Sequence, residues 1–176
     1  MTDDEGGEAP CFAHLLPDEA GGPSERPGEA RAPSEADLAQ LVGQLADAVV
    51  VADAEGTITL WNPAAARLFG WPAGQALGRS LDLIVPPRYR DRHWEGYRRV
   101  MATGHTRYGD RLLEVPALHR EGHRLSIAFT VTLLRRPGAD RPHAIAAVVR
   151  DETERWQEHR RLTEELARLR AGAGPD

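Results

Sequence analysis

A continuous apolar run, a turn and an alternating run follow one another directly over residues 48–60. Residues 49–51 are three consecutive valines, whose β-branched side chains favour strands. Residues 53–56 are turn-forming and end in a glycine that is free to take positive φ. In residues 57–60 polar and apolar side chains alternate. The pattern predicts two antiparallel strands joined by a tight turn.

Helix signals follow the second predicted strand. Asn62 is a favourable N-cap, Pro63 suits the first helical position, and Gly70 marks the end of a short helix. A longer helix is predicted over residues 89–102, where apolar or aromatic side chains recur every three or four residues and Gly104 follows. The period of the pattern therefore changes here from that of strands to that of helices.

Three further strands are predicted after the long helix. Strand-forming side chains recur in residues 111–118, 123–134 and 143–150. Glycine-containing turns separate them at residues 120–122 and 137–140. Together with the first pair, these segments predict a small domain built on five strands.

A helix is predicted on each side of this core. Ser34 is a favourable N-cap for a helix within residues 34–47. Its apolar side is formed by Leu38, Leu41, Val42 and Leu45. A C-terminal helix is predicted over residues 152–171, with an apolar seam of barely more than two heptads made by Trp156, His159, Leu162, Leu166 and Leu169. We expect this seam to pair with a second copy of the chain, so a homodimer is predicted.

Four short motifs in this order resemble those of PAS domains, the small sensor modules of signalling kinases, cyclases and transcription regulators. They are Trp61-Asn62, Gly70-Trp71, Arg120-Glu121-Gly122 and Asp151-Glu152-Thr153. The resemblance covers roughly residues 38–153. It implies an α+β PAS fold with its core at residues 48–151, in which a five-stranded antiparallel sheet carries short helices and one long crossing helix on one face.

The resemblance also implies a route for a signal. In PAS domains an Asp-x-Thr motif closes the core and leads into an output helix, so Asp151 and Thr153 are the expected signal-transmission residues. A carboxylate and a hydroxyl at this place can exchange between capping the helix and bonding to the core. The family implies regulation of transcription or of a phosphorelay, through a kinase, regulator or other effector protein that the sequence does not identify.

Composition narrows the class of protein. The 176 residues allow one domain of about 120 residues with extensions, and the net charge of −5 gives no reason to expect binding to nucleic acid or to an anionic membrane. Cys11 is the only cysteine, which suits a reducing compartment, and no apolar run approaches the ~20 residues of a membrane span. We therefore expect a cytoplasmic protein. Residues 1–33, rich in Gly, Pro and acidic side chains, and residues 172–176 are expected to be disordered.

No arrangement of side chains predicts an enzyme. The sequence has no converging Ser-His-acid or Cys-His set, no Walker-type phosphate loop and no Gly-x-Gly-x-x-Gly motif. His119 and His123 are close in sequence, but Gly122 puts a turn between them, so they are expected on opposite arms of a hairpin and no zinc site is predicted. A flavin is not expected either, because residues 71–87 lack the reactive cysteine of light-sensing PAS domains.

One motif is compatible with a haem-binding site. Some PAS domains sense oxygen through a b-type haem held by a histidine on the long helix, and residues 92–99 resemble their motif. The resemblance implies His93 as the iron ligand and Arg99 as the partner of a haem propionate. The distal side would then be lined by Tyr108, Phe129 and Val131. Where oxygen-sensing members place an arginine this chain has Leu113, and a pocket without that donor would hold oxygen poorly.

Three hypotheses about function follow. The first is a stand-alone PAS sensory and protein-interaction module that passes a ligand- or partner-induced shift through residues 151–153 to the C-terminal helix. The alternative is a haem-based gas or redox sensor built on His93. The third is a ligand-free structural adaptor whose interior is filled by its own side chains, namely Leu60, Leu68, Phe69, Ile84, Tyr97, Phe129, Val131 and Val148.

Overall fold

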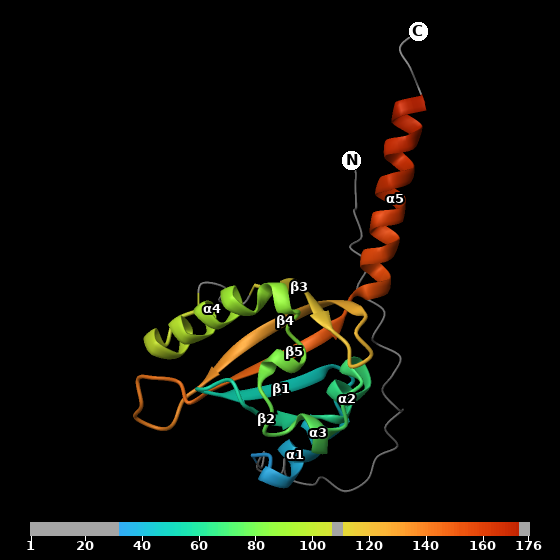
Figure 1. Ribbon diagram of the computed structural model, residues 1–176. Helices are drawn as coiled ribbons and strands as arrows, with labels where there is room; N and C mark the ends of the chain where they lie inside the picture. The colour runs from blue at the N-terminus through green and yellow to red at the C-terminus, as the bar shows by residue number, and fades with distance from the viewer. Residues whose placement is uncertain (1–31, 107–110, 173–176) are drawn as a thin grey trace, which may run out of the picture. The chain divides into compact units, whose positions relative to one another are not determined.

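Antiparallel pairing joins the strands of the computed structural model into one five-stranded sheet, in the order β2-β1-β5-β4-β3 (Figure 1). The strands are β1 Ala48–Asp53, β2 Ile58–Trp61, β3 Leu113–Leu118, β4 Arg124–Leu134 and β5 Ala144–Asp151. The structure describes residues 32–106 and 111–172. The predictions for the N-terminal tail, for the last four residues and for Tyr108 therefore lie outside the described residues. The predicted α+β fold is confirmed.

The β1–β2 hairpin forms because its turn carries its own hydrogen bonds. The Asp53 carboxylate accepts from the backbone N–H groups of Glu55 and Thr57, at 3.1 and 2.8 Å. Gly56 has φ +83°, and a Cβ built at this position would lie 2.2 Å from the Trp94 ring. Glycine is therefore required both for the turn conformation and for the close approach of the long helix.

Helices fill the connection between β2 and β3. They are α2 Pro63–Phe69, α3 Ala73–Ala76, the 3₁₀ turns η1 Leu81–Leu83 and η2 Pro87–Tyr89, and α4 Arg90–Thr103. The predicted helix ends are confirmed, because the Asn62 side chain accepts from the Ala65 N–H at 2.8 Å, and Gly70 and Gly104 close α2 and α4 with positive φ.

Helices α2, α3 and α4 pack on one face of the sheet. Alternate residues of a strand point to the same face, so Val50 and Ala52 of β1 share a face. Val50 belongs to a buried cluster with Phe69 of α2 and Ala76 of α3. Ala52 packs with Tyr97 of α4. The long helix is therefore on the same face as the short ones, as predicted.

The register of β5 corrects one prediction about the interior. Val149 is 3% exposed and packs in the cluster beneath α2, whereas Val148 is 43% exposed. Neighbouring residues of a strand point to opposite faces, so only one of the two valines can enter the core. Val148 lies on the other face and does not fill the interior.

One helix precedes the sheet and one follows it. These are α1 Glu35–Gln44 and α5 Thr153–Gly172. Ser34 caps α1 and forms a reciprocal pair of hydrogen bonds with Asp37, which confirms the predicted N-cap, although α1 is shorter than the predicted range. Among the helices in the described residues, none combines the length and the hydropathy that crossing a membrane requires.

Candidate functional site

The last strand and the C-terminal helix meet at residues 151–153. The Thr153 hydroxyl accepts a hydrogen bond from the backbone N–H of Ser126 at 3.0 Å and donates to the Ser126 carbonyl at 3.4 Å. The Glu152 N–H donates to the same carbonyl at 2.8 Å. The Asp151 carboxylate accepts from the Thr153 N–H at 2.9 Å. Asp151 thus holds the start of α5, while Thr153 ties that start to β4.

An ion pair joins the two flanking segments at the same end of the sheet. The Arg150 guanidinium donates to both carboxylate oxygens of Asp47, at 3.1 and 2.7 Å. These residues meet because β1 and β5 are antiparallel and Ala48 lies opposite Val149. The hydrogen bond from Arg150 lowers the pKa of the Asp47 carboxyl. The ion pair therefore links the residue directly before β1 to the end of β5, from which the chain continues into α5.

A cavity of about 280 Å³ lies at this junction. Its charged lining consists of Asp47, Arg67, Arg150 and Asp151. The junction therefore combines a hydrogen-bonded strand-to-helix connection with a charged hollow between the two flanking segments.

Asn62 holds the elements around the junction together, a role that goes beyond the helix cap predicted from the sequence. Its side chain is 4% exposed, and its amide oxygen accepts from the N–H groups of Val49 and Ala65 at 2.9 and 2.8 Å. Its amide nitrogen donates to the carbonyls of Val42 and Asp47, both at 3.1 Å. The helix cap was predictable from local sequence. The bonds to β1, to the last turn of α1 and to Asp47 were not, because they join residues distant along the chain.

His93 lies half-buried on α4 beside two other aromatic side chains. Its ring centroid is 4.9 Å from that of Trp94 and 5.9 Å from that of Tyr97. Burial lowers the pKa of His93 and outweighs the opposing effect of the Asp82 carboxylate, so the neutral ring is favoured. Its Nδ1 is buried without a hydrogen-bond partner in the described part of the chain. A neutral imidazole with a free nitrogen has the chemistry of an iron ligand.

The aromatic neighbours of His93 are themselves held in place. The Tyr97 hydroxyl donates to the carbonyls of Ala52, at 3.2 Å, and of Asp53, at the end of β1. Burial, followed by the nearby Asp53 and Glu55 carboxylates, raises the pKa of Tyr97, so the phenol stays protonated. The Trp94 indole N–H donates to the Asp82 carboxylate at 2.8 Å. These contacts fix α4 against the hairpin and against η1.

Two other residues of the haem resemblance, Arg99 and Leu113, have partners of their own in the structure. Arg99 is paired with the exposed carboxylate of Glu95, one helical turn away. Leu113 opens β3 opposite Phe129, so the position of the distal arginine carries an apolar side chain. Neither of two cavities in the described residues, of about 280 and 310 Å³, is lined by His93, Arg99, Leu113, Phe129 or Val131. His93 therefore suits an iron ligand, while Arg99 is engaged by Glu95 and neither of these two cavities joins the residues of the resemblance.

The apolar seam of α5 is solvent-exposed in the single chain. The exposed fractions are 49% for Trp156, 48% for Leu162, 54% for Leu166 and 65% for Leu169. Arg160 lies over the Trp156 ring, 5.3 Å from its centroid, which covers part of the indole. The prediction that these side chains form a seam for a second copy stays a prediction.

The sequence is similar to a family model and to several curated proteins. The model, described as PAS fold, matches residues 42–157. An uncharacterized protein of Azorhizobium caulinodans is 35% identical over 153 residues, which cover 86% of this chain and 20% of that protein. Sensor protein FixL of Bradyrhizobium diazoefficiens is 29% identical over 143 residues, which cover 74% of this chain and 25% of FixL. The chain therefore spans a quarter or less of the length of these relatives.

Solved structures share the fold. The crystal structure of the PAS domain of a protein from Colwellia psychrerythraea superimposes with a TM-score of 0.58 at 23% identity. The match covers 68% of this chain and 97% of that domain. With the five-stranded sheet, the helices on one face and the family match over most of the described residues, the chain belongs to the PAS fold family of sensory signalling domains.

Proposed function

We propose that this chain is the sensory and interaction module of a signalling protein and that it passes a ligand- or partner-induced shift of the sheet to helix α5. The observation that carries the proposal is the pair of hydrogen bonds between Thr153 and Ser126, which ties the first residue of α5 to β4. One relative is named a sensor protein, which supports this class of function. The effector proposed is a kinase or a transcription regulator acting after α5.

The junction suits a switch because its polar groups have two sets of possible partners. The Thr153 hydroxyl bonds to β4, but a hydroxyl at the start of a helix can also accept from the N–H groups of the helix itself. Such an exchange keeps the number of hydrogen bonds nearly constant, so the two states differ by only a few kcal/mol. A small movement of β4 then decides which arrangement α5 adopts.

Hydrogen exchange tests the coupling between β4 and α5. Thr153→Val removes the hydroxyl that accepts from Ser126, and losing these bonds costs about 1–2 kcal/mol. Exchange should therefore rise about 5- to 30-fold in peptides covering residues 124–128 and 153–157 together. Thr163→Val is the matched control, because the Thr163 hydroxyl donates only within α5, to the His159 carbonyl at 2.8 Å. A Thr153→Val protein in which only the helix exchanges faster would overturn the coupling.

The proposed output is pairing of α5 with a second copy through its exposed seam. Leu162→Asp combined with Leu166→Asp places two carboxylates in the seam and should convert a dimer into a monomer in solution scattering. Glu164→Asp combined with Arg168→Asp is the control, because it changes the net charge equally on the opposite side of the helix. An unchanged mass in the seam variant would show that the interface lies elsewhere.

A haem-based sensor is the second candidate, and one observation favours it. His93 is held neutral by burial and has a buried nitrogen without a partner in the described residues. Bound there, a haem would supply an iron that binds gas or changes redox state, with His93 as its protein ligand. Hemin titration tests this candidate. A sharp Soret band that is lost in His93→Ala would support it, whereas identical spectra of the two proteins would exclude His93 as the ligand.

A further inference from the structure

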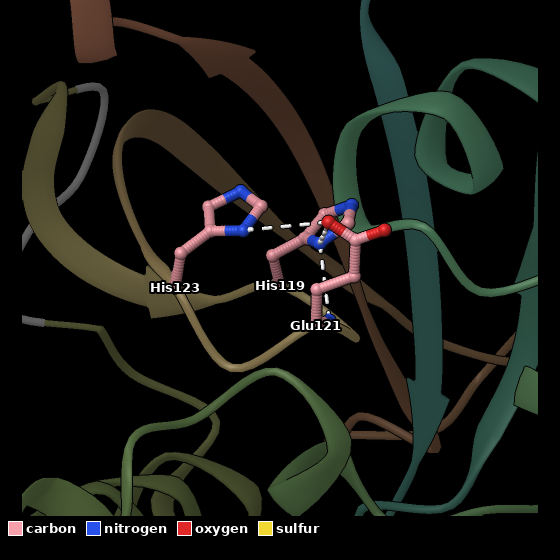
Figure 2. Close-up of side chains that lie close together, drawn as sticks. All are labelled: His119, Glu121 and His123. Atoms are coloured by element: carbon pink, nitrogen blue, oxygen red, sulfur yellow. Dashed lines mark hydrogen bonds and ion pairs between the residues drawn. The ribbon is translucent and has the colours of Figure 1, made fainter.

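The turn between β3 and β4 brings two histidines and a glutamate together (Figure 2). The backbone N–H of His119 donates to the carbonyl of His123 at 3.0 Å, and Gly122 closes the turn with φ +86°. The two imidazole rings are stacked with their centroids 4.2 Å apart. The two histidines lie on opposite arms of the hairpin, as expected, and because opposite arms are neighbours across the pair, this placement brings their rings together.

The possible ligand atoms of the three side chains converge. One Glu121 carboxylate oxygen lies 3.9 Å from Nδ1 of His119 and 3.9 Å from Nδ1 of His123. One ligand atom from each of the three residues lies within 4.8 Å of the others. The backbone N–H of Glu121 donates to Nδ1 of His119 at 3.2 Å, so the lone pair of this nitrogen is engaged within the turn, and a metal ion bound at Nδ1 would take the place of that hydrogen bond.

One of the three ligands is held rigidly and two are free to move. The His119 side chain is only 15% exposed and packs against Gly70, where an added Cβ would lie 2.4 Å from Nε2. The side chains of Glu121 and His123 are 78% and 54% exposed. Arg120, within the same turn, directs its guanidinium over the Trp71 ring, 5.3 Å from the centroid. The positively charged side chain within the turn, Arg120, is therefore directed toward Trp71.

We propose that His119, Glu121 and His123 bind a divalent transition-metal ion, of which Zn²⁺ is the representative probe. Two imidazoles and one carboxylate form a three-residue set known from zinc sites, with water as the fourth ligand. Tetrahedral coordination at Zn–N and Zn–O distances near 2.1 Å requires ligand atoms about 3.4 Å apart. The ligand atoms need to close by about 1 Å, and the Glu121 N–H must release Nδ1 of His119.

The site is connected to the junction through β4, and this part of the inference rests on the proposed function. His123 is followed directly by β4, and Ser126, three residues further on, holds Thr153. A metal that bridges the two arms of the hairpin restricts the start of β4. It therefore strengthens the strand that positions the first turn of α5.

Zinc titration of the full chain tests the site by calorimetry, with Co²⁺ absorption reporting the coordination geometry. One Zn²⁺ should bind to the wild type, and His123→Gln should weaken binding by at least about tenfold. His143→Gln is the matched control, because His143 is exposed and lies at the other end of β4, where its N–H donates to the Leu134 carbonyl. Zinc should also raise the melting temperature of the wild type and of the control, but not of His123→Gln.

Each result decides one part of the proposal. Equal zinc affinity of the wild type and His123→Gln, or no binding by the wild type, would overturn the site. Thr153→Val should bind Zn²⁺ as the wild type does, and zinc should slow exchange at residues 153–157 only when Thr153 is present. Binding without that change in exchange would overturn the coupling to α5 and support the metal site alone.

Discussion

Asn62→Ala removes a side chain that bonds three segments at once. Its amide oxygen accepts from the N–H groups of Val49 and Ala65, and its amide nitrogen donates to the carbonyls of Val42 and Asp47. The replacement therefore leaves the N-terminus of α2 without its cap, a buried N–H of β1 without an acceptor, and the carbonyls of Val42 in α1 and of Asp47 without their Asn62 donor.

The magnitude follows from these contacts. Loss of a helix cap costs about 1 kcal/mol, and an unsatisfied buried N–H costs about 1–3 kcal/mol. The free energy of unfolding should therefore fall by about 2–4 kcal/mol, and the melting temperature by about 6–16 °C, as measured by circular dichroism during thermal and urea unfolding. Exchange of the amides in the last turn of α1 and in the segment between α1 and β1 should rise as well, because each loses one hydrogen bond to Asn62.

Two other variants separate the parts of this effect. Asn62→Ser keeps an acceptor for the helix cap but cannot reach all the other partners, so its loss should be smaller than that of Asn62→Ala. Ser34→Ala removes only the exposed cap of α1 and should cost about 1 kcal/mol or less. If Asn62→Ala destabilised the protein no more than Ser34→Ala, the buried hydrogen bonds of Asn62 would not contribute to stability beyond a helix cap, and the reasoning would be refuted.

Three further outcomes are expected. Gly70→Ala should lower the free energy of unfolding by about 1–3 kcal/mol in urea titrations, because it strains positive φ and forces the His119 ring to move; an unchanged midpoint would contradict the close contact. The folded-state pKa of His93 is lowered, so its contribution to stability is complete above the unfolded pKa of about 6.5 and is lost as pH falls below it. The decline in melting temperature between pH 6.5 and pH 5 should therefore be shallower in His93→Leu, and parallel curves would contradict this assignment. The pKa of Asp47 is also lowered, so its pairing with Arg150 stabilises the fold above a pH of about 4 and is lost in acid. Asp47→Asn should reduce the fall in melting temperature at acid pH. An unchanged fall in melting temperature would exclude the ion pair with Arg150 as its cause.

Local chemistry was enough to predict the elements of this protein. The turn with Gly56, the caps at Ser34 and Asn62, and the helix end at Gly70 depend on contacts within a few residues, which side-chain type and backbone preference largely determine. The strand periods and the four motifs were likewise enough to indicate the PAS fold. Predictions that depend on neighbours in sequence were therefore confirmed.

Contacts between distant segments were decided only by the tertiary structure. Register placed Val149 in the core and Val148 outside it, a choice that an apolar run leaves open because both residues are valine. Cross-strand pairing stacked His119 on His123, and a hydrogen bond between segments that are distant in sequence joined Thr153 to Ser126. Arg99 pairs with Glu95 one helical turn away, a contact that the family motif does not specify. Sequence periodicity, where a clear alternation is present, predicts which residues of an element share a face. The pairing of strands and the packing of helices determine which face is buried and what lies opposite each residue.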